Sequence, residues 1–446
     1  MQMSSIMARV GALPISIAAM LFCAPALAQS GWGVWATPDA SCTDVQAWYG
    51  QQNIQSEPTG MRNIAYPEGN ATYWAGLITG ALGSSVTIKG QFPAARYMGI
   101  QVYDIEHNVR GAIGDQEINP DSGSNNPYRS GSTTALGTYT VKLVFGATPS
   151  TPAPNTIYSD GLTEVGLVYR VYYANNVKSL YGSTTSPKLP KIKQNGVTLS
   201  TCAPRPILPK SDTVNGHIDK YDFTGTIPLD TRPVTNPPSL LLSITNPFTP
   251  FYPSADNNYM SALISRQFMT APYDYNMVVM RMRAPTFPNT QAGEAPWLAT
   301  TDRQVRFWSV CENEPLTTGV ARCVADGQTQ PLDGTVTVVF SDPSNKPSSS
   351  QLQTWGASWL PFGALLDTDV VYNLDGEPKT NADGIYYYGF ILYRQTLANP
   401  SWTQSMASVG QLPRSQVKAA MGDYYPTIGY CRKSDFKTLG AGCIGL

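Results

Sequence analysis

Short stretches of alternating apolar and polar residues recur along the chain and predict β-strands. Residues 86–89 and 335–338 alternate in this way, as expected for strands with one face on a core and one face in water. Residues 165–173 and 384–394 form longer runs of β-branched and aromatic side chains, which strands favour. Clusters of Gly, Pro, Asn, Asp and Ser separate these runs and predict turns.

Helical patterns are few. Residues 42–51 fit one short helix, and residues 415–421 fit another that ends at Gly422. The chain is therefore predicted to be all-β and mainly antiparallel, built from β-sandwich or jelly-roll-like units.

The two halves of the chain resemble each other. Residues 66–78 (YPEGNATYWAGLI) and 252–264 (YPSADNNYMSALI) share five identical positions when aligned without gaps. Further pairs of similar segments follow in the same order along both halves: 86–93 and 278–285, 96–104 and 306–313, 140–145 and 335–340, and 168–175 and 392–399. The pattern predicts an internal duplication that places Arg96 over Arg306 and Arg170 over Arg394.

The predicted organisation has four parts. Residues 1–28 are expected to form a signal peptide, 29–182 a first β unit, 183–251 a Pro/Thr-rich strap, and 252–446 a second β unit with a disulfide-bearing tail. Seven prolines fall between residues 228 and 253, and this density excludes a run of central strands there.

The N-terminal residues have the features of an export signal. Arg9 is the one charged residue among the first 30, a mostly apolar run follows, and the run ends in Ala26-Leu27-Ala28. Cleavage is predicted near Ala28, which gives a secreted or periplasmic protein; an uncleaved membrane anchor is the alternative. No later apolar stretch reaches the roughly 18 residues that a membrane-spanning helix needs, so the mature chain is predicted to have no transmembrane segment.

Cysteine usage agrees with export. Six cysteines remain after the predicted cleavage, an even number that indicates disulfides in an exported protein, although six cysteines allow 15 pairings. The pairs favoured by short loop closure are Cys311–Cys323 and Cys431–Cys443, which leaves Cys42–Cys202.

Charge and motif content exclude several classes. The net charge is -1 and no basic run stands out, so a nucleic-acid partner is not expected. The chain has two histidines, which excludes a metal centre with three histidine ligands. Nucleophile-elbow, zinc-protease and phosphate-loop motifs do not occur, so the sequence leaves open whether the protein is an enzyme.

One loop stands out as a candidate ligand-binding site. Four ionisable side chains occur within seven residues at the end of a predicted strand: Asp104, Glu106, His107 and Arg110. Arg306 and Arg394 are expected to join them across the interface of the two units. The alternatives are a solvated turn for the loop and buried ion pairs for the arginines.

Oxygen-bearing side chains also alternate just after this loop. Asp115, Glu117 and Asp121 are weak candidates for calcium, the one cofactor that the sequence suggests.

The function predicted from these features is ligand binding. The chain holds 25 Tyr and 9 Trp, which suit stacking on sugars or apolar ligands. The expected ligand is a small molecule or polysaccharide held near the interface of the two units. The alternatives are a secreted hydrolase or lyase that uses carboxylates, and a structural surface protein without a small ligand.

Overall fold

The structure is a computed structural model that describes residues 50–53, 66–130, 137–175, 189–199, 253–265, 269, 274–296, 303–313, 320–362, 371–372, 378–379, 388–444 and 446. Three predicted features lie outside these residues: the signal peptide, the Cys42–Cys202 pair and the proline-dense part of the strap. Only the end of the predicted 42–51 helix falls within them.

Two mainly antiparallel sheets form the first unit. The inner sheet has the order β1 (Gly50–Asn53), β2 (Ala71–Thr79), β8 (Glu164–Ala174), β4 (Ala95–Tyr103) and β5 (Val109–Gly114). The outer sheet has the order β10 (Val197–Thr198), β9 (Lys191–Gln194), β3 (Ser85–Gln91), β6 (Thr138–Val144) and β7 (Thr156–Tyr158), with β6 and β7 parallel. The short helix α1 (Pro127–Ser130) lies between β5 and β6 in the chain.

The second unit repeats this arrangement. Its inner sheet has the order β11 (Asn257–Ser265), β19 (Tyr388–Ala398), β13 (Val305–Asn313) and β14 (Val320–Ala325). Its outer sheet has the order β16 (Ala357–Pro361), β15 (Thr335–Ser341), β12 (Met277–Arg283) and β20 (Thr427–Cys431), with β15 and β16 parallel. A separate hairpin joins β17 (Val371–Tyr372) and β18 (Pro378–Lys379).

Short helices accompany the second unit. The α-helices are α4 (Ser349–Thr354), α5 (Met406–Val409), α6 (Arg414–Met421) and α7 (Lys433–Leu439), and the 3-10 turns are η4 (Thr290–Ala292), η5 (Asp326–Gln328), η6 (Pro343–Asn345), η9 (Gly422–Tyr424) and η10 (Gly440–Cys443). Helix α6 confirms the helix predicted over 415–421, and Gly422 ends it with a positive φ of 57°. No helix among the described residues is long and apolar enough to cross a membrane.

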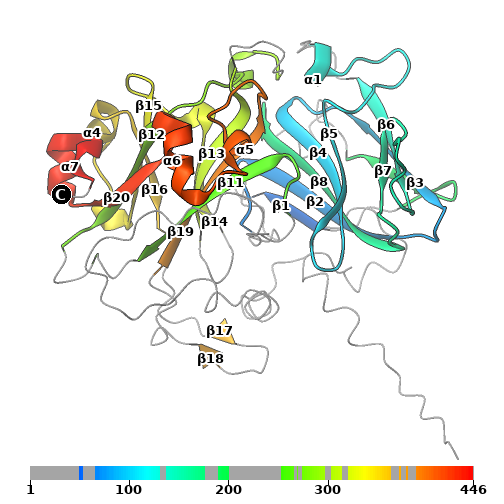
Figure 1. Cartoon of the computed structure of the whole chain (residues 1–446), viewed down its shortest axis with the longest axis horizontal. Coiled ribbons are helices and arrows are strands. Elements are labelled where there is room, and N and C mark those ends of the chain that lie inside the picture. The colour runs from blue at the N-terminus through cyan, green and yellow to red at the C-terminus, as the bar shows by residue number, and fades with distance from the viewer. Residues whose placement is uncertain are drawn as a thin grey trace, which may run out of the picture.

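The sheets form four layers. The two inner sheets face each other in the middle of the molecule, and the outer sheets lie at its two ends (Figure 1). Every residue of β4 and of β13 is buried, because one face of each inner sheet packs on its own outer sheet and the other face packs on the other unit. The layer between the units is rich in aromatic side chains, such as Tyr172 and Phe307, whose ring centroids are 5.6 Å apart.

The strand pairing confirms the two-unit all-β fold and the predicted duplication. Tyr73 pairs with Arg170 in the first inner sheet, and Tyr259 pairs with Arg394 in the second. Arg170 then lies opposite Gly99, and Arg394 lies opposite Ser309, so strand order and register are the same in both units. Arg96 and Arg306 accordingly occupy the same position on the equivalent strands β4 and β13.

A backbone irregularity also repeats. Tyr173 and Leu397 both adopt a left-handed conformation near the ends of the equivalent strands β8 and β19, with φ of 47° and 51°. The Tyr173 N–H donates to the Asn70 carbonyl, and the Leu397 N–H donates to the Asp256 carbonyl. Such conformations are energetically costly for side chains of this size, so their recurrence shows that the two units share the same backbone conformation at this point.

Strands β9 and β10 fall within the range 183–251 that the sequence analysis assigned to the strap. Strand β9 pairs with β3 and so extends the outer sheet of the first unit as far as β10. Residues 200–250 lie outside the described residues, and the domain boundaries stay a prediction.

Two disulfides are present among the described residues, and both pairings were predicted. Cys311 is bonded to Cys323 and Cys431 to Cys443, each across a separation of 12 residues. Disulfides of this kind indicate an oxidising environment.

Candidate functional site

Two of the four repeated arginines form reciprocal ion pairs between the units. Arg96 Nη1 lies 2.8 Å from Asp326 Oδ2, and Arg306 Nη1 lies 3.1 Å from Asp115 Oδ1. Each guanidinium also donates to the backbone carbonyl of the other arginine at 3.3 Å. All four side chains are fully buried, so this exchange fixes how one unit sits on the other.

Each aspartate also accepts a backbone hydrogen bond from its own unit. Asp115 accepts from the Met98 N–H at 2.9 Å, and Asp326 accepts from the Trp308 N–H at 3.1 Å. Burial raises the pKa of both aspartates to about 6, although the neighbouring arginines and these hydrogen bonds favour the ionised form.

The third arginine, Arg394, pairs with Glu68 of the first unit. Glu68 Oε2 accepts from Arg394 Nη1 and from the Ser309 hydroxyl, and Oε1 accepts from the backbone and side-chain nitrogens of Asn70. The fourth arginine, Arg170, donates to Gln101 Oε1. The structure thus places Arg306 and Arg394 in ion pairs within the chain, as the ion-pair interpretation of the sequence expects.

The predicted site loop is the hairpin turn between β4 and β5. Asp104 Oδ1 accepts from the backbone N–H groups of Glu106 and Asn108 at 2.8 and 2.9 Å, and Asp104 Oδ2 accepts from Arg110 Nε at 2.8 Å. Partial burial opposes ionisation of Asp104, but the hydrogen bonds from Asn108 and Arg110 outweigh it and lower the pKa of this carboxyl. His107 is buried at the tip with a positive φ of 66°.

This loop and Arg306 lie at opposite ends of β4. Arg306 bonds to the carbonyl of Arg96, which precedes Asp104 by eight strand positions, or about 26 Å along an extended chain. The structure therefore does not bring Arg306 together with Asp104, Glu106, His107 and Arg110.

The three calcium candidates each accept hydrogen bonds from a different part of the chain. Asp115 pairs with Arg306, Glu117 Oε2 accepts from the Gly114 N–H at 2.7 Å, and Asp121 Oδ2 accepts from the Thr138 hydroxyl at 2.8 Å. These three carboxylates do not gather as a common ligand set in the part of the chain that the structure describes.

A different group of acidic side chains meets at the interface of the units. Asp256, in the turn before β11, accepts a hydrogen bond of 2.5 Å from the Tyr97 hydroxyl of β4. Glu117 lies in the turn after β5. Gly114 separates the two carboxylates: a side-chain carbon built there would lie 3.3 Å from Asp256 Oδ2 and 3.6 Å from Glu117 Oε2.

This geometry brings carboxylates of both units within reach of one ligand. The two oxygens can be no more than about 7 Å apart, which is close enough for one ligand to contact both. Asp256 is half-buried, Glu117 is exposed and Tyr97 is fully buried. Burial raises the pKa of Tyr97, and Asp256 raises it further, so the phenol stays protonated and serves as a donor.

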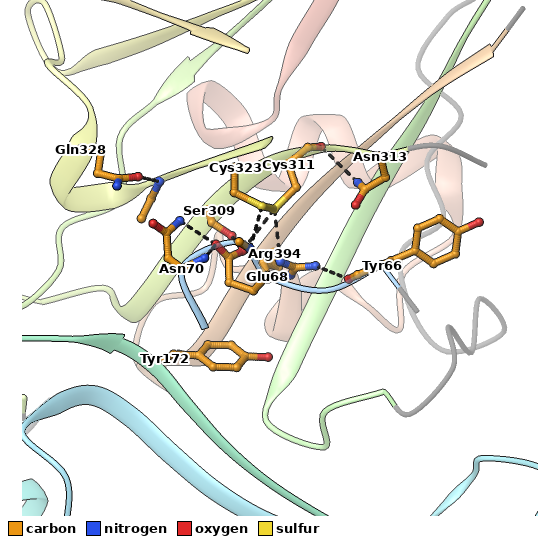
Figure 2. Close-up of a disulfide and its surroundings, with 12 residues drawn as sticks. Tyr66, Glu68, Asn70, Tyr172, Ser309, Cys311, Asn313, Cys323, Gln328 and Arg394 are labelled. Atoms are coloured by element: carbon orange, nitrogen blue, oxygen red, sulfur yellow. Dashed lines mark hydrogen bonds and ion pairs between the residues drawn. A yellow bond between two sulfur atoms is a disulfide. The ribbon is translucent and has the colours of Figure 1, made fainter. Parts of the chain in front are cut away.

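The equivalent positions of the other half carry no acid. Strand register places Phe307 at the position of Tyr97 and Ala325 at that of Gly114. Gln328 replaces Glu117, and its Oε1 accepts from the Ala325 N–H at 2.9 Å as Glu117 accepts from Gly114. Asn70 replaces Asp256; both Asn70 and Gln328 are drawn in Figure 2.

Sequence reasoning included Glu117 as a calcium candidate and as one of several candidates for carboxylate chemistry, and it missed Tyr97 and Asp256. The signal that could have found them is the alignment of the halves, in which Asp256 stands opposite Asn70. Differences between repeats that exchange an acid for its amide are readable from such an alignment once the repeat is known.

Comparison with known proteins gives little beyond this geometry. No protein-family model matches the chain, and no curated protein matches it. A putative uncharacterized protein from Burkholderia cenocepacia is 14% identical, with a TM-score of 0.47, and the match covers 89% of this chain and 84% of that one. The VPA0106 protein from Vibrio parahaemolyticus is also 14% identical, with a TM-score of 0.37 and coverage of 81% and 89%.

Proposed function

We propose that this is an exported, disulfide-bonded protein that binds a hydroxyl-rich ligand, a small molecule or a polysaccharide, between its two units. The binding site consists of Tyr97, Glu117 and Asp256. The observation that carries the proposal is the exchange of acids for amides at equivalent positions. Gln328 of the second half keeps the turn hydrogen bond that Glu117 makes in the first, and Asn70 of the first half keeps the backbone hydrogen bond that Asp256 makes in the second.

Carboxylates suit such a ligand because they are pure acceptors. Two carboxylates offer several acceptor positions to neighbouring hydroxyl groups, and the Tyr97 hydroxyl holds Asp256 in place by donating to it. One acid comes from each unit, so a ligand that bridges them contacts both halves of the molecule.

The test uses a variant in which each acid is replaced by the amide that stands at the equivalent position of the other half. Asp256→Asn with Glu117→Gln should leave thermal stability within a few degrees of the wild type, because the equivalent amides are accommodated in the other half. Binding of oligosaccharides and polyols, measured by calorimetry across a panel, should weaken at least tenfold. Asp160→Asn, which changes an exposed acid elsewhere, is the matched control and should bind as the wild type does.

Gly114→Ala gives an independent check. The equivalent Ala325 shows that this backbone accepts a side-chain carbon, yet a carbon at Gly114 would crowd the Asp256 carboxylate at 3.3 Å. The variant should fold normally and lose affinity. Wild-type affinity in both the double variant and Gly114→Ala would reject the site.

A second candidate function is hydrolysis at the same carboxylates. The close approach of Asp256 and Glu117 favours it, because one half-buried and one exposed carboxyl could serve as acid and base on either side of a glycosidic bond. Incubation of the protein with the same oligosaccharides, followed by mass spectrometry, separates the two: new cleavage products that disappear in Glu117→Gln indicate an enzyme, and intact ligand indicates binding alone.

Export is tested separately. The disulfides indicate an oxidising environment, and we infer that the chain reaches it by cleavage near Ala28. N-terminal sequencing of the protein from the periplasmic and extracellular fractions should begin close to Gln29; a chain that starts at Met1 would contradict this.

A further inference from the structure

The two disulfides have very different surroundings. Cys431–Cys443 lies in an apolar cluster with Met277, Val279, Val339 and Phe436. Cys311–Cys323 joins directly opposed residues of β13 and β14, in the inner sheet that faces the first unit. Figure 2 shows this second disulfide among polar and charged groups that come from both units.

Three groups contact its sulfur atoms. The Gly69 N–H donates to Cys323 Sγ at 3.1 Å, across the interface. Arg394 Nη1 lies 3.3 Å from Cys311 Sγ, and Glu68 Oε2 lies 3.2 Å from the same sulfur. Arg394 and Glu68 also form the ion pair between the units, so the disulfide is part of that contact.

These groups match the needs of the reduced cysteines. A thiolate is stabilised by N–H donors and by a nearby cation, and a thiol can donate to a carboxylate. After reduction, Cys323 could remain a thiolate that accepts from Gly69, and Cys311 could become a thiol that donates to Glu68. The apolar surroundings of Cys431–Cys443 offer no comparable stabilisation and disfavour a thiolate.

We propose that Cys311–Cys323 is a redox-sensitive latch: its reduction by a dithiol loosens the contact between the two units. Cys431–Cys443, in contrast, is a structural bond. One thiolate of the dithiol attacks Cys323 Sγ, since Cys323 is 9% exposed and Cys311 is fully buried. Cys311 leaves beside the Arg394 guanidinium and takes up a proton. The second thiol of the dithiol then loses its proton to water and displaces Cys323 as a thiolate. Two electrons and one proton have passed to the protein, the other proton is in the solvent, and the dithiol has become a disulfide.

The first test compares the two bonds in the same molecule. The folded mature protein is equilibrated with mixtures of reduced and oxidised dithiothreitol, and thiols are trapped by alkylation and assigned by peptide mass spectrometry. Cys311–Cys323 should be half reduced at a ratio of reduced to oxidised reagent at least tenfold lower than Cys431–Cys443, equivalent to about 30 mV. Reduction of both bonds together, or of Cys431–Cys443 first, would overturn the proposal.

The second test asks whether opening the bond loosens the interface. At a ratio that reduces only Cys311–Cys323, hydrogen exchange of the amides of Tyr66 and of residues 68–70 should speed up at least tenfold, while amides of the outer sheets keep their protection. Cys311→Ala with Cys323→Ala should reproduce this in the absence of reductant, and Cys431→Ala with Cys443→Ala, the matched control, should not. If the alanine variants do not fold, the partially reduced wild type gives the same measurement. Unchanged exchange at 66–70 would show that the bond is not a latch.

Discussion

Replacing Glu68 with Gln should be among the most damaging conservative changes in this protein. Glu68 is fully buried and surrounded by donors on both oxygens: Arg394 and the Ser309 hydroxyl on one, two nitrogens of Asn70 on the other. A glutamine has one oxygen and one NH₂ group. Whichever way its amide turns, the NH₂ group faces donors, and Arg394 loses the charge that balances it.

The magnitude follows from the burial of this pair. Removing one partner of a buried ion pair costs about 3–5 kcal/mol, because the remaining charge is left uncompensated in the interior. Domains are stable by about 5–15 kcal/mol, so Glu68→Gln should still fold but with a strongly reduced free energy of unfolding. Urea unfolding at pH 7.5, followed by tryptophan fluorescence, gives this value from the midpoint and slope.

Ser254 supplies the matched control, since it stands at the position of Glu68 in the second half. Its hydroxyl accepts two long hydrogen bonds, from Gln101 Nε2 at 3.3 Å and from the Asp256 N–H at 3.4 Å, so Ser254→Ala should cost only about 1 kcal/mol. A cost below about 1 kcal/mol for Glu68→Gln, or equal costs for the two variants, would refute the view that Glu68 is the buried counter-ion of Arg394.

Three further outcomes are expected. Carboxyl NMR should find two aspartates that titrate near pH 6, and each signal should be lost in one of the variants Asp115→Asn and Asp326→Asn. A folded pKa above the usual 3.8 means that the folded chain binds more protons than the unfolded chain. The stability contributed by these two groups is therefore full below about pH 4 and is lost as the pH rises through 6. Removing Cys431–Cys443 should cost about 3 kcal/mol in urea unfolding, as expected for a loop of this length. Gly422→Ala should cost about 1–3 kcal/mol by the same measurement, because φ is 57° and ψ is −129° there; a loss below 0.5 kcal/mol would contradict that backbone geometry.

Much of the architecture was readable from the sequence because it is encoded locally. Alternation in 86–89 and 335–338 predicts strands β3 and β15, and similarity between the halves aligns Arg96 with Arg306 from the sequence alone. The two short-range disulfides were predictable because close cysteines meet at little entropic cost.

The packing of the two units and the position of the candidate site could not be predicted, because they depend on residues that are far apart in the sequence. All nine residues of β4 are buried, but the sequence does not show that the second unit covers the face that would otherwise be wet. The charges of 104–110 drew attention because they are adjacent in sequence, yet Asp104 uses its neighbours to build a turn. Asp256 and Glu117 are far apart in the chain, and only the docking of the units brings them together.

The duplication separates residues that hold the fold from residues that are free to act. Each half contributes one arginine to the Arg96–Asp326 and Arg306–Asp115 pairs and one aspartate to the other pair. This repetition is expected of residues that the fold requires, because each half supplies the same surface to the interface. Tyr97, Glu117 and Asp256, in contrast, are not repeated at the equivalent positions of the other half. Phe307, Gln328 and Asn70 give the same strand register and the same turn hydrogen bond without any acid, so the fold does not require the acids. The acids are thus positions at which the two halves differ without a requirement of the fold, and for this reason we propose them as the residues that contact a ligand.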